Sequence, residues 1–294
     1  MSQEIELKLA LGAVDSERLG RHPRLATLVP QAIELRNTYF DTPQGDLERA
    51  RVALRIREKR RQGATDLQRL QTLKTSGRGS GGLSIRGEWE WPIAGAELDL
   101  VGLAALPPMQ DVDASLLDAL TPRFRTDFRR LAWQLEMHGS RIELALDIGE
   151  IIAGERRAQI RELELELQEG EVAHLWQLAL ELAEWLPLRP ASASKAARGT
   201  ALVDCRWTLP EACVSRADCL ERATSALDAF YDSGAAHFAA VAHEALARLA
   251  ALGDDRLSTQ LHTFLAAPGD GDRLTTELGQ TLVALARDLH AAQA

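Results

Sequence analysis

Residues 4–9 read EIELKL, in which a charged residue alternates with an apolar one at every step. In a β-strand successive side chains point to opposite faces, so Glu4, Glu6 and Lys8 share one face and three apolar residues share the other. Such alternation predicts a half-buried strand. The pattern alone fits a strand with one solvent-facing side, and other segments have to decide where the charged face points.

The same period of two recurs along the first two thirds of the chain. It marks eight segments, at residues 5–11, 34–42, 52–60, 67–75, 84–91, 128–137, 140–149 and 159–168. Between them, Asp15–Leu28 and residues 170–186 have helical spacing. The glycine-rich residues 75–84 predict a flexible hairpin loop and lack the Gly-Lys-Ser/Thr end of a P-loop. Eight strands suffice to close a barrel.

Charges of opposite sign are separated by segment, with acids on the first and last segments and bases on the middle ones. Glutamates two residues apart on one strand face, such as Glu4 and Glu6, lie roughly 7 Å apart. At an effective dielectric constant near 20 they repel by about 2.4 kcal/mol, a cost that a bound cation would remove. A barrel with its charged face inward would offer an acidic wall to divalent metal ions and a basic wall to phosphates. An antiparallel sheet with one wet face is the alternative.

Composition narrows the class of protein. A length of 294 residues predicts about two domains, and 46% hydrophobic residues suffice for ordinary cores. The net charge of −9 argues against a nucleic-acid surface over the whole protein. Three cysteines without Cys-x-x-Cys spacing predict a reducing compartment and no zinc site. Without a signal-like apolar segment or a membrane span, we expect a soluble cytoplasmic protein.

Lysine is rare in this chain. Of 34 basic residues, four are lysines: Lys8, Lys59, Lys74 and Lys195. The ammonium group is a compact point charge, whereas guanidinium is a planar fork. The four lysines are therefore candidates for positions where a compact cation is needed.

The opening segment resembles the Glu-x-Glu-x-Lys signature of the CYTH superfamily, the triphosphate tunnel metalloenzymes. Later motifs follow in the family's order: YFDT (39–42), LRIR (54–57), TLK (72–74), RGEWE (86–90), TDFRRLAW (126–133), SRIELALDIGEI (140–151), ELELEL (162–167) and SKAARG (194–199). The resemblance is greatest to bacterial inorganic triphosphatases in which a CYTH domain precedes a helical CHAD domain. It implies an α+β protein built on a closed eight-stranded antiparallel β-barrel tunnel with surrounding helices, followed by a C-terminal α-helical bundle.

The resemblance also implies site residues, carried over position by position. The implied ligands of Mg²⁺ or Mn²⁺ are Glu4, Glu6, Asp147, Glu162 and Glu164, with Glu162 and Glu164 on the wall opposite Glu4 and Glu6. The implied substrate-binding cations are Lys8, Arg55, Arg57, Lys74, Arg86, Arg130, Lys195 and Arg198. Arg130 is chosen over Arg129 because it stands three residues before Trp133, as in the family. Lys195 and Arg198 would share one face of a short helix that closes one tunnel end.

The implied activity is metal-dependent hydrolysis of inorganic triphosphate to pyrophosphate and phosphate. Phosphoryl transfer asks mainly for positioning and charge neutralisation. Glu88, beside Lys74, is the expected catalytic base because it faces the same way as Arg86, and a second metal ion is the alternative activator of water. These two residues, Lys74 and Glu88, form the expected catalytic pair.

The two expected parts are a CYTH catalytic domain at residues 1–207 and an α-helical domain at 208–294. Four helices are predicted in the second part, near 214–231, 235–252, 255–266 and 272–291. It resembles a partial CHAD domain but is too short for a whole one. Residues 209–294 hold six arginines, no lysine and twelve acids, which argues against polyphosphate binding. We expect these helices to pack on the tunnel domain or to form a dimer.

Two other functions stay open. One keeps the tunnel but takes an organic substrate, as a thiamine triphosphatase, a nucleoside triphosphatase or a class IV-type adenylyl cyclase. It is disfavoured because no stacking residue is evident among the tunnel-facing residues. The other is a non-catalytic phosphate-binding scaffold, which would not need two acidic walls. The expected partner is inorganic triphosphate, with no nucleic acid and no membrane.

Overall fold

The computed structural model describes residues 2–12, 16–110, 112–211, 213–252 and 274–292. Its strands are β1 (Ser2–Leu11), β2 (Gln31–Asp41), β3 (Val52–Arg61), β4 (Gln68–Thr75), β5 (Leu83–Pro92), β6 (Thr121–Met137), β7 (Ser140–Ala153), β8 (Arg156–Glu169) and β9 (Leu188–Pro190). Its α-helices are α1 (Ser16–Gly20), α2 (Asp46–Arg49), α3 (Leu100–Ala104), α4 (Val172–Ala183), α5 (Lys195–Asp204), α6 (Arg216–Ser233), α7 (Ala236–Ala251) and α9 (Thr276–Ala291). Two short 3₁₀ helices, Pro107–Met109 and Ala114–Ala119, lie between β5 and β6.

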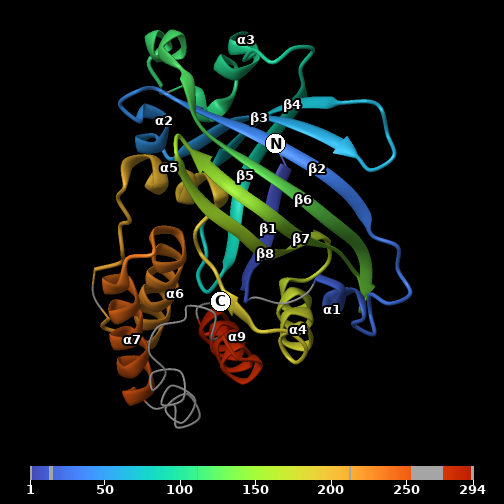
Figure 1. Ribbon diagram of the computed structural model, residues 1–294, viewed down its shortest axis with the longest axis vertical. Helices are drawn as coiled ribbons and strands as arrows, with labels where there is room; N and C mark the ends of the chain where they lie inside the picture. The colour runs from blue at the N-terminus through green and yellow to red at the C-terminus, as the bar shows by residue number, and fades with distance from the viewer. Residues whose placement is uncertain (1, 13–15, 111, 212, 253–273, 293–294) are drawn as a thin grey trace.

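The first eight strands form a closed antiparallel barrel (Figure 1). Neighbours pair in the order β5-β4-β3-β2-β6-β7-β8-β1, and β1 then pairs with β5, which joins the two edges. The short β9 pairs with β1 at Leu9–Leu11, beyond the part of β1 that pairs with β5. The structure thus confirms the predicted eight-stranded closed barrel and its α+β class.

The apolar strand faces point outward and are covered by helices. Leu7 and Leu9 of β1 and Leu165 of β8 are buried in one large apolar cluster. The cluster also contains buried residues of α4, α6, α7 and α9, such as Trp176 and Leu282. Burial of apolar area is the main favourable contribution to folding, so this layer fixes the strand faces and turns the charged face inward.

The predicted helix at SKAARG is present as α5, and it covers one end of the barrel. Leu202 of α5 packs on inward-facing Tyr39, Phe124, Phe128 and Ile160. The helix is capped by Ser194, whose side chain accepts a hydrogen bond from the backbone N–H of Ala197. At Gly199 an added Cβ would lie 2.0 Å from the ring of Phe124, so only glycine lets α5 approach β6 this closely.

Other helices differ in extent from the sequence prediction. The helix expected at Asp15–Leu28 is described only as Ser16–Gly20, followed by turns, because Pro23 disfavours helical backbone at the preceding residue. In the second part, α6 and α7 pair with each other, whereas α9 lies against β9 and α4. The helix expected at 255–266 lies outside the described residues.

The C-terminal helices share the apolar cluster of the barrel, so they pack on it. The division at residues 207 and 208 stays a prediction. Within the described ranges no helix is both long enough and apolar enough to cross a membrane.

We predict that Gly199→Ala destabilises the protein, although alanine is the better helix former. Its methyl group would overlap Phe124, and overpacking of this kind costs about 1–3 kcal/mol. Gly20→Ala is the matched control, since nothing lies within 4 Å of its added Cβ. Thermal unfolding should show a lower Tm for the first variant only, and equal Tm values would contradict the close packing of α5 on β6.

Candidate active site

The barrel encloses a cavity of about 1050 Å³ lined by the charged strand faces and by α5. All four lysines of the chain line it. Of the residues expected in the site, those on the cavity wall are Glu4, Glu6, Lys8, Arg55, Arg57, Lys74, Arg86, Glu88, Arg130, Glu164 and Lys195. The remaining three do not line the cavity themselves: Asp147 and Glu162 pair with Lys195 and Lys8, which do, and Arg198 pairs with Glu162 behind the wall. The period of two therefore predicted the inward faces of these strands.

The relative position of the acidic residues differs from the expectation. Glu162 and Glu164 were expected opposite Glu4 and Glu6, but β8 pairs directly with β1, and Lys8 lies opposite Glu164 in register. Closure of the barrel places the first and last strands side by side. The expected carboxylates then fall into two groups on neighbouring strands, and Lys8 lies between the groups, 3.3 Å from Glu6 and 3.6 Å from Glu164.

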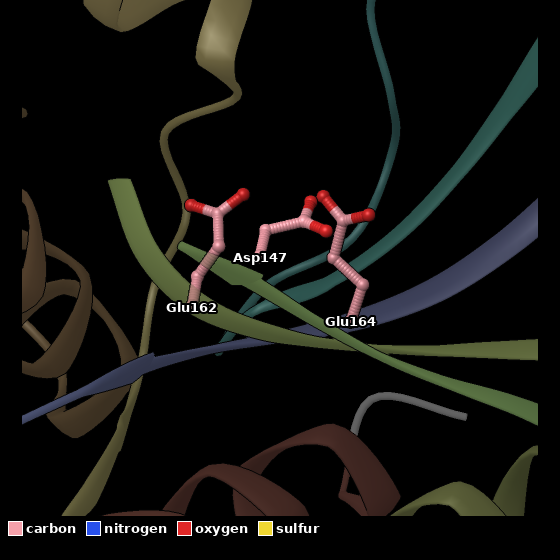
Figure 2. Close-up of side chains that lie close together, drawn as sticks. All are labelled: Asp147, Glu162 and Glu164. Atoms are coloured by element: carbon pink, nitrogen blue, oxygen red, sulfur yellow. The ribbon is translucent and has the colours of Figure 1, made fainter. Parts of the chain in front are cut away.

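The first group is an acidic triad formed by Asp147 of β7 and by Glu162 and Glu164 of β8. Their carboxylates point to the same side, as Figure 2 shows, and one oxygen of each lies within 4.8 Å of the others. The Lys195 ammonium is seated among them. Its Nζ lies 2.6 Å from Asp147 and 2.8 Å from Glu164, and it also donates to Glu162.

Neighbouring cations compensate the negative charges of the triad. Arg130 donates to both oxygens of Asp147, at 2.8 and 2.7 Å, and also to Glu164. Burial acts to raise the pKa of Glu164, but Lys195, Arg130 and Lys8 outweigh it and hold the pKa well below its usual range. Burial likewise acts to lower the pKa of Lys195, and the three carboxylates raise it instead. Arg130 is thus directed inward, whereas Arg129 is exposed.

The second group consists of Glu4 and Glu6, joined by Arg86 of β5. Arg86 donates from Nε to Glu4 at 2.5 Å and from Nη2 to Glu6 at 2.9 Å. Lys74 donates to both oxygens of Glu4, at 2.7 and 3.0 Å. Burial acts to raise the pKa of Glu4, but Lys74 and Arg86 outweigh it and lower the pKa to about 2. Lys74 also lies 3.2 Å from the expected base, Glu88.

The basic wall on β3 is less completely compensated. Arg55 is 6% exposed, and its Nε and Nη2 groups are buried without a hydrogen-bond partner. The carboxylate of Glu88 lies 3.9 Å from Nη2. Burial, together with repulsion from Arg55 and Arg130, lowers the pKa of Arg57 to about 10. Buried donors without acceptors are costly, so this wall is suited to an anion with several oxygen atoms.

Further charged residues to which sequence reasoning gave no role in the site also line the cavity. Glu166 lines the cavity and continues the alternation of Glu164, a signal that could have assigned it a role. Burial, with repulsion from Glu4 and Glu143, raises its pKa to about 7. Lys59 and Glu90 also line the cavity.

The expectation that no stacking residue faces the tunnel was wrong. Tyr39 and Phe124 line the cavity and stack on each other with ring centroids 4.6 Å apart. The alternation rule failed here because the inward face of β2 is largely apolar, with Ile33 and Leu35 on the cavity wall, and packs against α5.

We predict that Lys195→Met makes stability depend on a divalent cation. The variant keeps the aliphatic stem but leaves three buried carboxylates short of a cation, and breaking a buried ion pair costs about 3–5 kcal/mol. Mg²⁺ or Mn²⁺ should then raise the Tm of this variant more than that of the wild type. Lys59→Met, away from the triad, is the control. An equal metal-induced shift in all three proteins would show that the triad does not hold the ion.

We predict that Glu166→Gln stabilises the protein only at higher pH. The folded-state pKa of Glu166 is raised from 4.5 to about 7, so its stabilising contribution is complete below pH 4.5 and is lost as the pH rises through 7. At about 1.4 kcal/mol per pKa unit, the loss amounts to about 3 kcal/mol. The glutamine variant lacks this loss. Its Tm should exceed that of the wild type above pH 7, and a Tm difference independent of pH would contradict the raised pKa.

Comparison with known proteins assigns the family. A family model described as the CYTH domain matches residues 2–200. An inorganic triphosphatase from Haemophilus influenzae is 37% identical over 201 residues, which are 68% of this chain and 54% of that protein. The chain thus spans about half the length of this curated relative.

Two solved structures have a weaker likeness. A protein from Hippeastrum, named as a candidate adenylyl cyclase with a dominant triphosphatase activity, has a TM-score of 0.46 and 22% identity, covering 67% of this chain and 95% of its own. A protein from Bacillus halodurans named as a candidate adenylate cyclase has a TM-score of 0.37 and 21% identity, covering 62% and 91%. Both scores lie below 0.5, so the fold rests on the strand pairings. Because the CYTH model covers more than half of the residues, this chain belongs to the CYTH domain family.

Proposed function

We propose that this protein hydrolyses inorganic triphosphate to pyrophosphate and phosphate inside the barrel, with Mg²⁺ or Mn²⁺ as cofactor. The observation that carries the proposal is the wall of β3, where Arg55 holds two buried donor groups without acceptors. A chain of phosphates supplies many acceptor oxygens together with negative charge, and the basic wall on β3 lacks both. The inorganic triphosphatase of Haemophilus influenzae, 37% identical, supports the same assignment.

The proposed substrate-binding residues are the inward cations Lys8, Arg55, Arg57, Lys74, Arg86, Arg130, Lys195 and Arg198. All of them except Arg198 line the cavity, from five strands and one helix, so they surround it instead of forming a flat patch. Arginine forks bind phosphate oxygens in pairs, whereas lysine acts as a point charge. Such a set can hold a flexible polyanion in one orientation and spread the charge of the leaving pyrophosphate.

The proposed metal ligands are Glu4, Glu6, Asp147, Glu162 and Glu164. Their donor chemistry fits, since hard divalent cations take carboxylate oxygens and the triad oxygens are close enough to share one ion. When bound, the ion would supply Lewis-acid polarisation of the phosphate oxygens. Lys195 and Arg86 pair with these carboxylates and hold them in place.

Glu88 is the proposed general base. Its carboxylate lines the cavity beside Lys74, which can neutralise the charge on a phosphate near that carboxylate. A base must reach the attacking water by a hydrogen bond, and a cavity-facing carboxylate can do so. Glu88 would accept the proton of the water while Lys74 orients the phosphate.

The aromatic pair Tyr39 and Phe124 on the cavity wall is the feature that would favour an organic triphosphate as substrate. The two rings stack on each other and are nearly buried, which leaves little free face for a base. We therefore favour the inorganic substrate. A cytoplasmic location, and the division into a catalytic part (1–207) and a helical part (208–294), are proposed on the sequence alone.

We predict that Arg55→Gln loses activity without losing stability. Replacing the guanidinium deletes substrate contacts worth about 1.5–3 kcal/mol for a charged hydrogen bond, so kcat/KM for tripolyphosphate should fall about tenfold to hundredfold. The Tm should stay level or rise, because the free protein no longer buries the Arg55 charge with its unmatched Nε and Nη2 donors.

The assay measures phosphate released from tripolyphosphate, thiamine triphosphate and ATP, with Mg²⁺, with Mn²⁺ and with a chelator. Arg129→Gln is the control, since Arg129 is exposed on the same barrel. Glu4→Gln should abolish the metal-dependent release. No hydrolysis of tripolyphosphate by the wild type, or faster hydrolysis of an organic triphosphate, would refute the proposed substrate.

A further inference from the structure

The segment that carries Lys195 is held at both ends by α6. It runs from Arg189 of β9 to Arg198 of α5, with Lys195 between them. Two aspartates one turn apart on α6, Asp228 and Asp232, face this segment and are 8% and 7% exposed. Asp228 pairs with Arg189 at 2.7 Å, and Asp232 pairs with Arg198.

The contact between Asp232 and Arg198 is geometrically complete. Arg198 donates from Nε to both carboxylate oxygens, at 3.1 and 3.0 Å, and from Nη2 to Oδ1 at 2.6 Å. Nη2 also donates to the backbone carbonyl of Gln159 at 2.6 Å. A planar guanidinium held by this many bonds has little freedom to rotate.

The remaining nitrogen of Arg198 reaches the acidic triad. Nη1 lies 3.4 Å from Glu162, which also accepts from Lys195. The CYTH family model matches residues 2–200, and α6 lies outside that range. The Arg198 guanidinium therefore connects α6 with Glu162, a proposed metal ligand on β8. The chain of contacts runs Asp232, Arg198, Glu162, Lys195.

Stability alone gives a weak reason for this arrangement. Asp232 is buried, which raises its pKa despite Arg198, and Asp228 adds repulsion from one turn away. Buried ion pairs often contribute no more net stability than apolar residues of the same volume. What a multiply bonded buried pair does supply is a fixed orientation for its members.

We propose that Asp232 is a positioning residue for the tunnel site, acting through Arg198 to fix α5 and the Glu162 carboxylate. The inference rests on the proposed function and extends it. The C-terminal helices contribute no group to the reacting phosphates through this contact, but they orient Arg198, which contacts the proposed metal ligand Glu162. The helical part is then a support of the active site and not an independent module.

The test uses Asp232→Asn in the full chain, with Asp228→Asn as matched control. Both variants remove one buried carboxylate charge from the same helix, but only the first releases Arg198. Loss of outer partners around a metal site typically costs about 10–100-fold, so kcat/KM for tripolyphosphate should fall by that amount in Asp232→Asn. Asp228→Asn should keep wild-type kcat/KM even where its Tm falls.

A double-mutant cycle distinguishes an effect of Asp232 that acts through Arg198 from a general loss of stability. Arg198→Gln lowers activity by itself, and adding Asp232→Asn to it should change kcat/KM no further, because the residue through which Asp232 acts is gone. The double variant buries no unpaired charge, so it should fold at least as well as Asp232→Asn. Should Asp232→Asn not fold, Asp232→Glu takes its place in the cycle.

Three results would overturn the positioning role: wild-type kcat/KM in Asp232→Asn, an equal loss in Asp228→Asn, or additive losses in the double variant. Failure of the proposed function is a separate outcome, seen as no phosphate release by the wild type. In that case the same four variants are compared by calorimetric affinity for tripolyphosphate. The same non-additivity in binding supports the role, and its absence or a lack of binding by the wild type overturns it.

Discussion

Charge compensation inside a closed barrel is the constraint on which the rest of this structure depends. Removing an ion from water costs several kcal/mol unless a well-placed partner compensates it. Asp147 is fully buried, and it is held by Arg130 from β6 and by Lys195 from α5. Such pairs join β7 to a neighbouring strand and to the helix that covers one end of the barrel.

The first strand has a special position because it closes the barrel. Glu4 lies opposite Arg86 of β5 in register, and Lys8 lies opposite Glu164 of β8. Opposite charges on neighbouring strands stabilise a sheet by about 0.2–1 kcal/mol per pair. A strand carrying both signs on one face can therefore match an arginine on one side and a glutamate on the other. The EIELKL stretch thus joins β5, where it faces an arginine, to β8, where it faces a glutamate.

The sequence predicted the inward faces well because the period of two is a local property of each strand. It could not predict which walls adjoin, since strand order is set by closure between residues far apart in the chain. The opposite-wall placement of Glu162 failed for this reason. Tyr39 was missed because α5 fills the barrel end beside β2, where apolar residues are the inward ones. The Asp232 contact with Arg198 joins residues 34 positions apart, and no local pattern indicates it.

The charged groups on the two sides of the cavity differ in how many hydrogen-bond partners they have, and this difference affects whether an anion or a cation binds more readily. The acidic groups on β1 and β8 already have ammonium and guanidinium partners at hydrogen-bond distance. Arg55 has buried donors without acceptors, and Arg57 has a lowered pKa. An anion therefore meets unmet donors on β3 at once, whereas a cation has to compete with Lys195 and Arg86 for carboxylate oxygens. Under the proposed function, each N–H of Arg86 that turned to a phosphate oxygen would release an oxygen of Glu4 or Glu6. Anion binding and cation binding at Arg86 would then favour each other by reciprocal linkage.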